Sequence, residues 1–579
     1  MLKLFKCFRK KEYFLMFIVL LLVVGQVYLE LKMPDYMSQI TVLVQTEGSK
    51  MGDILYNGGF MLLCAFFSLV SAIIVSYLVA YISSFFSLKT RKKLFDKVER
   101  LGMYEVKKFS TSSLITRTTN DINQVEMLIG MGLQLILKAP IMAVWAISKI
   151  LNKSWQWSGL TTLAVVILLT VISILMVIVV PKFKIVQNLI DKLNDVTREN
   201  LTGIRVVRAF NAEKYQEEKF DKANNNLTNQ QMFNQKAFAL MSPVMYLVMY
   251  FLALGIYFIG AFLIKDALMV DKLTIFSDMV VFSTYAMQVI MSFLLLAMIF
   301  MILPRAQVSA KRINEVLDSP ITIKDGGDIT KESEIGTIEF RNVSFKYPDA
   351  EEYILKNITF KIEKGETAAF IGSTGSGKST LINLIPRFYD IEEGEILVDG
   401  KNVKDYKLED LYKKLGYVSQ KAVIFNGSVN FNVSFGSFED SEHIKEAVNI
   451  AEASEFVEKL ENKYDTDIAS GGTNVSGGQK QRLSIARAIY KKPEIYIFDD
   501  SFSALDYKTD ARLRSNLKKY TKESTILIVA QRIGTIMNAD KIVVLDNGKM
   551  IGLGTHKELL KTCNVYKEIA LSQLSKEEL

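Results

Sequence analysis

Residues 372–380 have the types and spacing of a phosphate-binding loop, Gly-Ser-Thr-Gly-Ser-Gly-Lys-Ser-Thr. The apolar run 367–371 precedes this loop and the run 381–385 follows it, which predicts a strand, a tight loop and a helix. Glycines let backbone N–H groups turn inward around a polyphosphate, and the helix N-terminus adds its positive end. The alternative is a glycine-rich surface turn, which the flanking runs and the Lys-Ser pair disfavour. The predicted nucleotide-binding residues are Gly372, Ser373, Thr374, Gly375, Ser376, Gly377, Lys378, Ser379 and Thr380.

Basic, hydroxyl and acidic side chains in the same half of the chain suit metal binding and catalysis. Lys378 can reach the outer phosphates, and the hydroxyl of Ser379 can ligate Mg²⁺. The apolar run 495–498 ends in two acids, of which Asp499 can hold the water shell of the metal beside Ser379. Asp500 is where a carboxylate that activates water would sit. These positions predict that the chain binds and hydrolyses a nucleoside triphosphate.

Polar or aromatic residues adjoin three other apolar runs. Gln420 follows the run 415–418, and its amide suits a contact with Mg²⁺ or with the attacking water. Gln531 ends the strand-like run 524–530. Tyr347 precedes the loop, where its ring could stack on an adenine base, although an isolated aromatic residue is more often part of a core.

A second glycine-rich turn opens a helical run after residue 475 and predicts another anion site. Since one domain holds one triphosphate, the second turn suggests use by another copy of the domain. The alternative is a helix cap, which explains the serine of the turn but not its two glycines and its glutamine. The residues of this turn are Ser476, Gly477, Gly478 and Gln479.

The first half of the chain has the composition of a membrane domain. The sequence has 579 residues, of which 50% are hydrophobic, and its mean hydropathy is +0.19. A bilayer core of about 30 Å needs about 20 helical residues to cross it. Six apolar segments reach that length. They lie near 13–33, 57–84, 127–150, 157–180, 237–264 and 276–303.

The basic residues set the expected orientation of these spans. The net charge of +8 could suggest nucleic acid, but much of the Lys and Arg lies beside apolar runs, which favours a membrane protein and no nucleic-acid partner. Lys and Arg cluster at the N-terminus and after spans two and six, so these parts should face the cytoplasm. The expected domains are a membrane domain over 1–319, a linker over 320–336 and a cytoplasmic ATPase domain over 337–579.

Two long internal connections, 85–126 and 181–236, should project beyond the bilayer. Within them, 113–121 and 199–211 mix Arg with small and apolar residues at places where a helix pair must turn. They are interpreted as contacts that carry motion from the nucleotide domain to the membrane helices, or as solvated loops.

One charge falls inside a predicted span. Lys138 lies within 127–150, where a charge is expensive and faces a cavity or a partner. The alternative is a misplaced helix end from which the side chain snorkels.

Together these residues carry a family resemblance. The phosphate loop, Gln420, the turn at 476–479, the acid pair and Gln531, in this order and spacing, resemble the nucleotide-binding domain of an ABC transporter. The run Val-Ser-Gly-Gly-Gln-Lys-Gln-Arg at 475–482 is the most specific element. The first half resembles the six-helix exporter-type membrane domain.

The resemblance implies a six-span α-helical membrane domain followed by an α/β P-loop ATPase domain with a helical subdomain. It also implies ATP and Mg²⁺ as ligands, with Ser379, Gln420 and Asp499 on the metal. In this family two ATPase domains close head to tail, so a half-transporter needs a second subunit. The turn at 476–479 then serves the partner's ATP, and Asp506 lies in an interface loop.

Two positions depart from the family pattern. Asp500 stands where the family usually has Glu, and Gln531 stands where it usually has His. Asp is one methylene shorter, and a misplacement of roughly 1 Å can cost on the order of a hundredfold in rate, about 2.7 kcal/mol. Gln carries no positive charge and no transferable proton. We therefore expect a slow ATP site here and a heterodimer in which a partner supplies the fast site.

The expected function is ATP-driven export of hydrophobic or amphipathic compounds, such as drugs, across a bacterial cell membrane. The alternatives are a lipid or peptide exporter, an importer on the same scaffold, a soluble ATPase of the chromosome-maintenance type, and an ATP-gated channel or sensor. The six apolar spans argue against the soluble ATPase.

Overall fold

The computed structural model describes residues 2–5, 8–46, 48–151, 155–268, 271–327 and 335–574. The chain divides into two compact units. One comprises Met1–Glu99 and Ser112–Asp318, and the other comprises Arg100–Thr111 and Ser319–Leu579. Seven residues of the expected linker, 328–334, lie outside the described residues.

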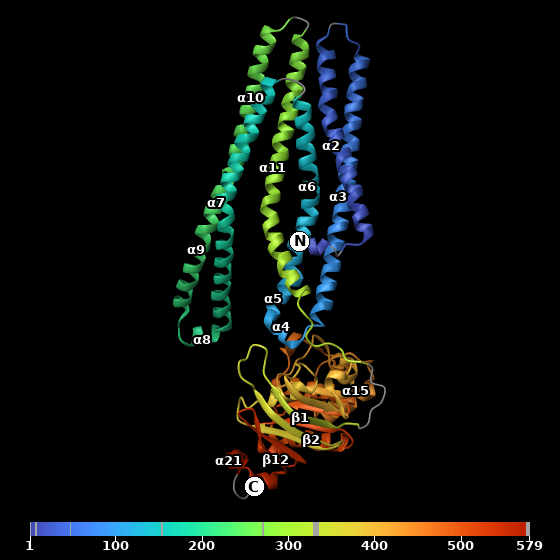
Figure 1. Ribbon diagram of the computed structural model, residues 1–579, viewed down its shortest axis with the longest axis vertical. Helices are drawn as coiled ribbons and strands as arrows, with labels where there is room; N and C mark the ends of the chain where they lie inside the picture. Colours follow the sequence, from blue (N-terminus) through green and yellow to red (C-terminus); the bar gives the residue numbers. More distant parts are fainter. Residues whose placement is uncertain are drawn as a thin grey trace. The chain divides into compact units, whose positions relative to one another are not determined.

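The first unit consists of long helices, and among the residues that the structure describes six helical segments are long and apolar enough to cross a membrane. This confirms the six predicted spans and the α-helical membrane fold. Several helices run far beyond the predicted apolar segments, because the helical pattern continues through the polar sequence that follows them (Figure 1). The helices are α1 (Leu2–Phe5), α2 (Lys10–Gln45), α3 (Met51–Val98), α5 (Thr111–Thr116), α6 (Ile122–Leu151), α7 (Trp155–Thr202), α8 (Ile204–Ala209), α9 (Glu213–Ala239), α10 (Met241–Asp266) and α11 (Lys272–Leu317).

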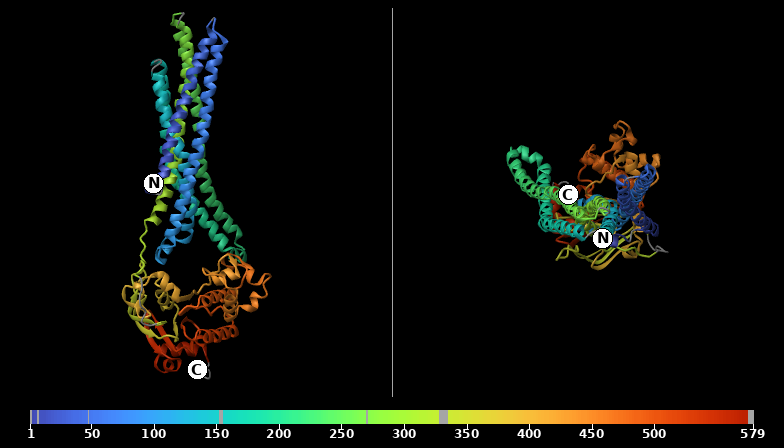
Figure 2. Two further views of the ribbon diagram at one scale, coloured as in Figure 1. Left: turned by 90° about the vertical axis from the view of Figure 1, so that its right-hand side faces the viewer. Right: turned by 90° about the horizontal axis from the view of Figure 1, so that it is seen from above.

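The membrane helices pack in neighbouring pairs. α2 lies against α3, α6 lies against α11, and α7 lies against α9 and α10. On α2 the buried residues recur every four positions, which places them on one face of the helix. α7 and α9 diverge from the other long helices towards the short helix α8 (Figures 1 and 2). The buried apolar residues of α2 are Val19, Val23, Val27 and Leu31.

The first internal turn differs from the sequence prediction. The chain turns over 99–110, around α4 (Met103–Phe109), and not at 113–121. The predicted stretch instead forms α5 and a π-helical turn, η1 (Arg117–Asp121), which lead directly into α6. The end of this stretch contacts α11, because the Asp121 carboxylate accepts a hydrogen bond from Ser309 Oγ of α11 at 2.8 Å. The second internal turn lies at α8, within the predicted 199–211.

The second unit is built on a six-stranded sheet of order β12-β11-β3-β10-β9-β6. β3, β10, β9 and β6 are parallel, and each has a run of buried apolar residues. Such runs are typical of a sheet that is covered on both faces. The strands are β3 (Thr367–Gly372), β6 (Leu415–Val418), β9 (Ile495–Asp499), β10 (Thr525–Val529), β11 (Lys541–Asp546) and β12 (Lys549–Gly554).

A four-stranded antiparallel sheet of order β2-β1-β4-β5 lies in the same unit. Its buried residues join one face of the large sheet in a hydrophobic core, whereas helices α14–α17 pack into a second core. The strands are β1 (Ile338–Phe345), β2 (Leu355–Ile362), β4 (Glu393–Val398), β5 (Lys401–Asn402), β7 (Gly427–Ser428) and β8 (Asp467–Ile468). The helices are α12 (Lys378–Leu384), α13 (Leu408–Lys414), α14 (Val429–Ser434), α15 (Ser441–Ile450), α16 (Ser454–Val457), α17 (Gly477–Tyr490), α18 (Tyr507–Tyr520), α19 (Ile533–Ile536), α20 (His556–Thr562) and α21 (Asn564–Gln573).

Candidate functional site

The candidate site lies at the carboxyl ends of the parallel strands. Val529 of β10 is in register with Phe370 of β3 on one side and with Asp499 of β9 on the other. Val418 of β6 is in register with Phe498. Because these ends are level, the phosphate loop, the acid pair and the two predicted glutamines project from one edge of the sheet. Open α/β sheets bind their ligands at this edge.

The phosphate loop has the backbone that the glycine spacing predicts. Gly377 has a φ of +98°, which L side chains rarely adopt, and a Cβ on Gly372 would collide with the carbonyl oxygen of Leu545. The Lys378 ammonium folds onto the loop and donates to the carbonyl oxygens of Gly372, at 2.9 Å, and of Ser373, at 2.8 Å. Burial lowers the pKa of Lys378, and the nearby carboxylates of Asp499 and Asp500 oppose this shift. The loop therefore presents a cation and backbone N–H groups at the start of α12.

Two predicted metal ligands lie in direct contact. Ser379 Oγ donates a hydrogen bond of 2.8 Å to Asp499 Oδ1, so the two oxygens point at one place. Burial raises the pKa of Asp499. A hydroxyl and a buried carboxylate are hard oxygen donors, and Mg²⁺ is usually held by one or two such groups together with nucleotide phosphates. These two residues fit Mg²⁺, which they would hold beside the phosphate loop, where the ion would neutralise phosphate charge.

Asp500 and Gln531 are brought together across β9 and β10. Gln531 Nε2 donates to Asp500 Oδ2 at 3.0 Å, and the Asp500 amide donates to the carbonyl oxygen of Val529 at 3.0 Å. Burial raises the pKa of Asp500, and a hydrogen bond from Gln420 is the largest opposing effect. The two residues that depart from the family pattern therefore contact each other directly, and Gln420 reaches the same carboxylate.

Tyr347 lies beside the phosphate loop. Its hydroxyl is 3.1 Å from Thr380 Oγ1, and its ring packs edge-on against Phe345 and Tyr389. The Lys107 ammonium lies 5.6 Å from the centre of the same ring. Tyr347 is half-buried, and its stacking on an adenine base stays a prediction.

The turn at 476–479 caps α17. Ser476 Oγ accepts from the Gln479 amide at 3.3 Å, and Gln479 Oε1 accepts from the Ser476 amide at 2.8 Å. The expectation that a cap would explain only the serine is wrong, because this reciprocal capping box uses the glutamine as well. Gly477 has open space where a Cβ would be, whereas a Cβ on Gly478 would lie 3.2 Å from the carbonyl oxygen of Ala504.

Asp506 caps the next helix with its side chain alone, without a reciprocal capping box. Its carboxylate accepts a hydrogen bond of 2.9 Å from the Thr509 amide at the start of α18. Backbone hydrogen bonds, of which that from Thr509 is the strongest, lower the pKa of Asp506. The close approach of Gly478 to Ala504 places the start of α17 beside the segment that Asp506 ends.

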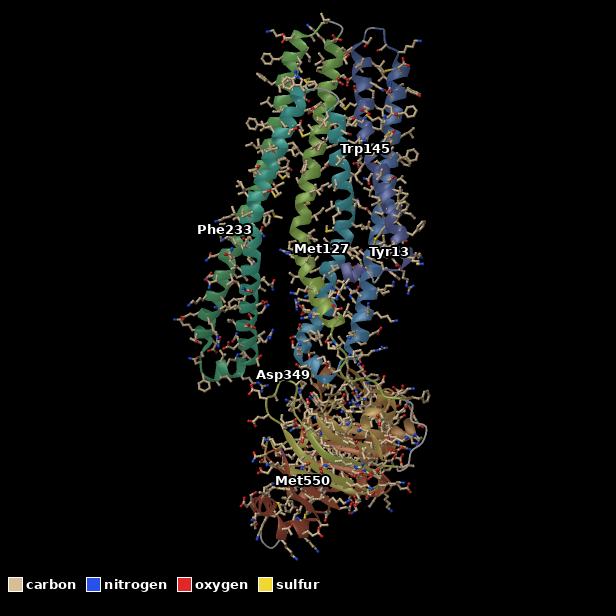
Figure 3. The ribbon with its side chains drawn as sticks, viewed as in Figure 1. Tyr13, Met127, Trp145, Phe233, Asp349 and Met550 are labelled. Carbon is tan, nitrogen blue, oxygen red and sulfur yellow. The ribbon has the colours of Figure 1, made fainter. Side chains whose placement is uncertain are left out.

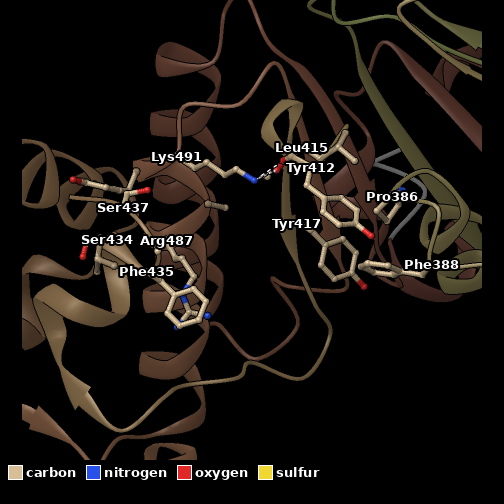
Figure 4. Close-up of a pocket in the computed structure, with 15 residues that line it drawn as sticks. Pro386, Phe388, Tyr412, Leu415, Tyr417, Ser434, Phe435, Ser437, Arg487 and Lys491 are labelled. Carbon is tan, nitrogen blue, oxygen red and sulfur yellow. Dashed lines mark hydrogen bonds between the residues drawn. The ribbon is translucent and has the colours of Figure 1, made fainter. Parts of the chain in front are cut away.

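A pocket of about 410 Å³ lies between β6 and helices α14 and α17 (Figure 4). Arg487 lines it and donates to the carbonyl oxygens of Asn432, at 2.8 Å, and Val423, at 3.0 Å. Phe425 and Phe435 stack on each other, and the Arg487 guanidinium lies 5.3 Å from the centre of the first ring and 5.2 Å from that of the second. Burial lowers the pKa of Arg487 to about 10. Arg487 was not predicted as a functional residue, because it belongs to no motif with a recognisable spacing in the sequence.

The membrane unit contains charged residues that the sequence analysis missed. Lys138 Nζ lies 2.8 Å from Glu30 Oε1, so this lysine has a partner and does not merely snorkel. Lys149 Nζ lies 2.8 Å from Asp35 Oδ2, which also places an α6 lysine against an α2 acid. The sequence signal for these ion pairs was the pair of acids Glu30 and Asp35, which lie near the end of the first predicted span. Nearby, Trp145 of α6 packs against Tyr28 of α2, with ring centres 5.7 Å apart (Figure 3).

Both halves of the chain match sequence families. Residues 15–312 match the ABC transporter transmembrane region, and residues 355–503 match the ABC transporter family. The chain is 35% identical over 547 residues, 93% of each chain, to an uncharacterized ABC transporter ATP-binding protein of Mycobacterium tuberculosis. The chain is an ABC transporter. It is of the half-transporter kind, with one membrane domain and one ATP-binding domain in a single chain.

Other relatives of the transporter have more specific names. An ATP-dependent lipid A-core flippase of Hahella chejuensis is 42% identical over 276 residues, 47% of each chain. A putative multidrug export ATP-binding/permease protein of Staphylococcus aureus is 44% identical over 257 residues, 44% of each chain.

The transporter also shares its fold with a bacterial Atm1-family ABC exporter solved with ATP bound. The TM-score is 0.81 at 22% identity, and the match covers 98% of this chain and 99% of the other. The fold is thus that of an exporter, and the transporter is a multi-pass membrane ATPase coupled to transport.

Proposed function

We propose that the transporter exports hydrophobic or amphipathic compounds as one half of a heterodimer. We also propose that the ATP bound at its own phosphate loop is hydrolysed only slowly. The binding part of this site is complete. Lys378, Ser379 and Asp499 have the contacts that phosphate and Mg²⁺ binding need, and ATP bound at the loop would replace the carbonyl contacts of the Lys378 ammonium.

The contact between Asp500 and Gln531 carries the proposal of slow hydrolysis. A general base must reach the proton that it removes, directly or through one water. The Asp500 carboxylate is one methylene shorter than that of Glu, and one of its oxygens accepts from Gln531. Burial raises the pKa of Asp500, and hydrogen bonds from Gln420 and Gln531 oppose this shift, so both amides bind the carboxylate that would have to position the water. Gln531 supplies an amide N–H but no positive charge for the transition state.

A subunit with a slow ATP site can still support transport if its partner has a phosphate loop with both catalytic residues. The turn at 476–479 has no departure from the family pattern, so it can complete the ATP site of another subunit. A homodimer would combine two slow sites and would have no evident route to rapid turnover. The heterodimer therefore uses the intact part of this chain to support hydrolysis on the other.

The substrate class rests on the membrane unit and on the relatives. Names that mention lipid A-core and multidrug export both concern amphipathic or hydrophobic compounds. A lipid exporter is the second candidate, and the apolar groove described below favours it over a peptide exporter.

The test is the ATPase activity of this chain, purified alone and purified together with a half-transporter from the same organism that has Glu and His at the two corresponding positions. The proposal expects slow hydrolysis by the chain alone and brisk hydrolysis by the pair. Brisk hydrolysis by the chain alone would refute the heterodimer.

A further inference from the structure

A cluster of polar side chains joins three membrane helices. Glu30 of α2 accepts hydrogen bonds from Lys138 of α6 at 2.8 Å and from Gln26, one turn away on α2, at 2.9 Å. Ser68 of α3 donates to the same oxygen at 3.4 Å. Lys138 lies near the middle of the apolar segment predicted at 127–150, where a charge is costly and marks a functional position. We call Gln26, Glu30, Ser68 and Lys138 the polar cluster.

The polar cluster has an acceptor without a donor. Gln26 is 4% exposed, and its Oε1 has no hydrogen-bond partner among the residues that the structure describes. Buried polar atoms are almost always hydrogen-bonded. The Gln26 amide lies beside the Glu30 carboxylate, so the two side chains together are suited to a donor that carries more than one N–H group.

An apolar groove of about 540 Å³ runs between α2 and α3, which lie side by side (Figure 1). Its lining includes Met33, Leu62 and Ala65. Two further lining residues, Gly58 and Gly59, have no atom within 4 Å of the place where a Cβ would be. The groove is therefore open along its floor and offers contacts to hydrocarbon.

The groove ends about one helical turn from the polar cluster on both α2 and α3. Met33 is three residues from Glu30, and Ala65 is three residues from Ser68, so each lining residue shares a helix face with a cluster residue. From Ile54 to Ala65 the groove extends for roughly 16 Å along α3, at 1.5 Å per residue. An apolar channel that ends near a charged pair has the shape of a site for an amphipathic molecule.

We propose that this site binds a single-chain amphiphile whose zwitterionic head carries a primary ammonium and an anionic group. The ammonium donates to Glu30 and to the free oxygen of Gln26, the anionic group pairs with Lys138, and the alkyl chain lies in the groove. A simple cation would displace Lys138 from Glu30 and leave the lysine without a partner. A simple anion would do the same to Glu30, and an unpaired buried charge is strongly unfavourable.

The proposal deepens the proposed function, since it names the class of amphipathic compound at one place in the membrane unit. The alkyl chain would point towards the external ends of α2 and α3, with the head inside the span. A lipid at rest in the external leaflet has the opposite orientation, so the site suits a molecule in transit.

The experiment is photolabelling of the full-length transporter in its membrane with lysophosphatidylethanolamine that carries a diazirine in its alkyl chain. We expect the label on peptides that contain Met33 and Leu62. Excess unlabelled lysophosphatidylethanolamine should compete roughly tenfold better than lysophosphatidylcholine, whose head has no N–H donor, because a charge-assisted hydrogen bond is lost. The labelling needs no ATP. Its result therefore tests the amphiphile site independently of the proposals of a heterodimer and of slow hydrolysis.

Variants locate the two halves of the site. Gly59→Leu fills the groove without a collision and should abolish this labelling, whereas Gly52→Leu, also on α3 with open space at its Cβ, should leave it unchanged. The double variant Glu30→Gln with Lys138→Met removes both charges together, so neither charge is left without its partner. It should keep labelling of the groove but lose the preference between the two competitors. Label spread evenly over the membrane helices, or a head preference that survives the double variant, would overturn the proposal.

Discussion

The side-chain nitrogen of Gln531 donates a hydrogen bond of 3.0 Å to the carboxylate of Asp500. The two residues follow the ends of neighbouring parallel strands, β9 and β10, and their contact follows from the register that places Asp499 beside Val529. The pair occupies the place where a longer acid and a histidine would act on the nucleotide. The proposal of slow hydrolysis therefore rests on one hydrogen bond, which mutation of either residue can remove.

Restoring the longer acid and the histidine should speed this site. We expect Asp500→Glu with Gln531→His to raise hydrolysis at this chain's own loop by on the order of a hundredfold, because the acid regains its reach. The measurement is ATPase activity of the heterodimer in a Gly478→Asp background, which disables the turn that serves the partner's ATP. Gln531→His alone is the control and should give a smaller gain. An unchanged rate in the double variant would point to a different cause of slowness.

Asp500 should also make stability depend on pH. Because burial raises its native pKa, the folded protein holds this proton to higher pH than the unfolded chain does. The free energy of unfolding therefore falls as pH rises from the ordinary aspartate range, near 3.8, through the raised native pKa. Asp500→Asn removes that loss and should raise the melting temperature of the nucleotide-free transporter at pH 8 by on the order of 2 °C.

The gain from Asp500→Asn should shrink as the pH is lowered from 8 to 5. Asp440→Asn is a control of opposite sign, since the backbone hydrogen bond from His443 is the largest effect that lowers the pKa of Asp440. Its carboxylate contributes stability at high pH that is lost as pH falls through the native pKa. A gain for Asp500→Asn that grows towards low pH would contradict the assigned shift.

Mg²⁺ should strengthen ATP binding through Ser379. The wild-type transporter should bind ATP more tightly with Mg²⁺ than with a chelator, and Ser379→Ala should remove on the order of tenfold of that gain, because one metal ligand is lost. Equilibrium binding of a fluorescent ATP analogue measures both values. Ser373→Ala, an exposed side chain in the same loop, should keep the full gain. An undiminished Mg²⁺ effect in Ser379→Ala would remove this residue from the metal site.

Arg487 should stabilise the region between β6 and α14. Its three hydrogen bonds join helix α14, at Asn432, to the segment at Val423, and its guanidinium is mostly buried. We expect Arg487→Met to lower the free energy of unfolding by about 2–4 kcal/mol, because buried carbonyl oxygens lose their donors. Arg487→Lys should recover little, since an ammonium cannot reproduce the planar fork. Thermal unfolding of the full transporter checks both, and a near-neutral Arg487→Met would contradict this account.

Most of the ATPase site followed from local sequence. The glycines of the phosphate loop, the acid pair and the capping serine each act within a few residues of their own strand or helix. The contact of Asp500 with Gln531 depends instead on which strands are neighbours, and the strand order comes from packing that no single segment encodes. Gln479 was misjudged because its role in the cap appears only with the helix start at Gly477 in place.

In the membrane half, hydropathy predicted the six spans but not the pairing of charges. Lys138 was visible as an exception within an apolar run, whereas Glu30 lies inside the first predicted span, 13–33, and was not singled out. The first internal turn was placed too late, because 113–121 has a turn-like composition and yet continues a helix that α11 supports at Asp121. Such contacts between distant segments decide where a long polar connection bends.

The central claim is that the ATP on this chain's own phosphate loop stays intact while the transporter turns over. Photoaffinity labelling during steady turnover, with 8-azido-ATP that carries its radioactive phosphorus in the γ position, tests it directly. If the claim holds, this chain keeps the γ label, and the Asp500→Glu, Gln531→His variant loses it. Loss of the γ label from the unmodified chain, at the rate of overall hydrolysis, would contradict the claim.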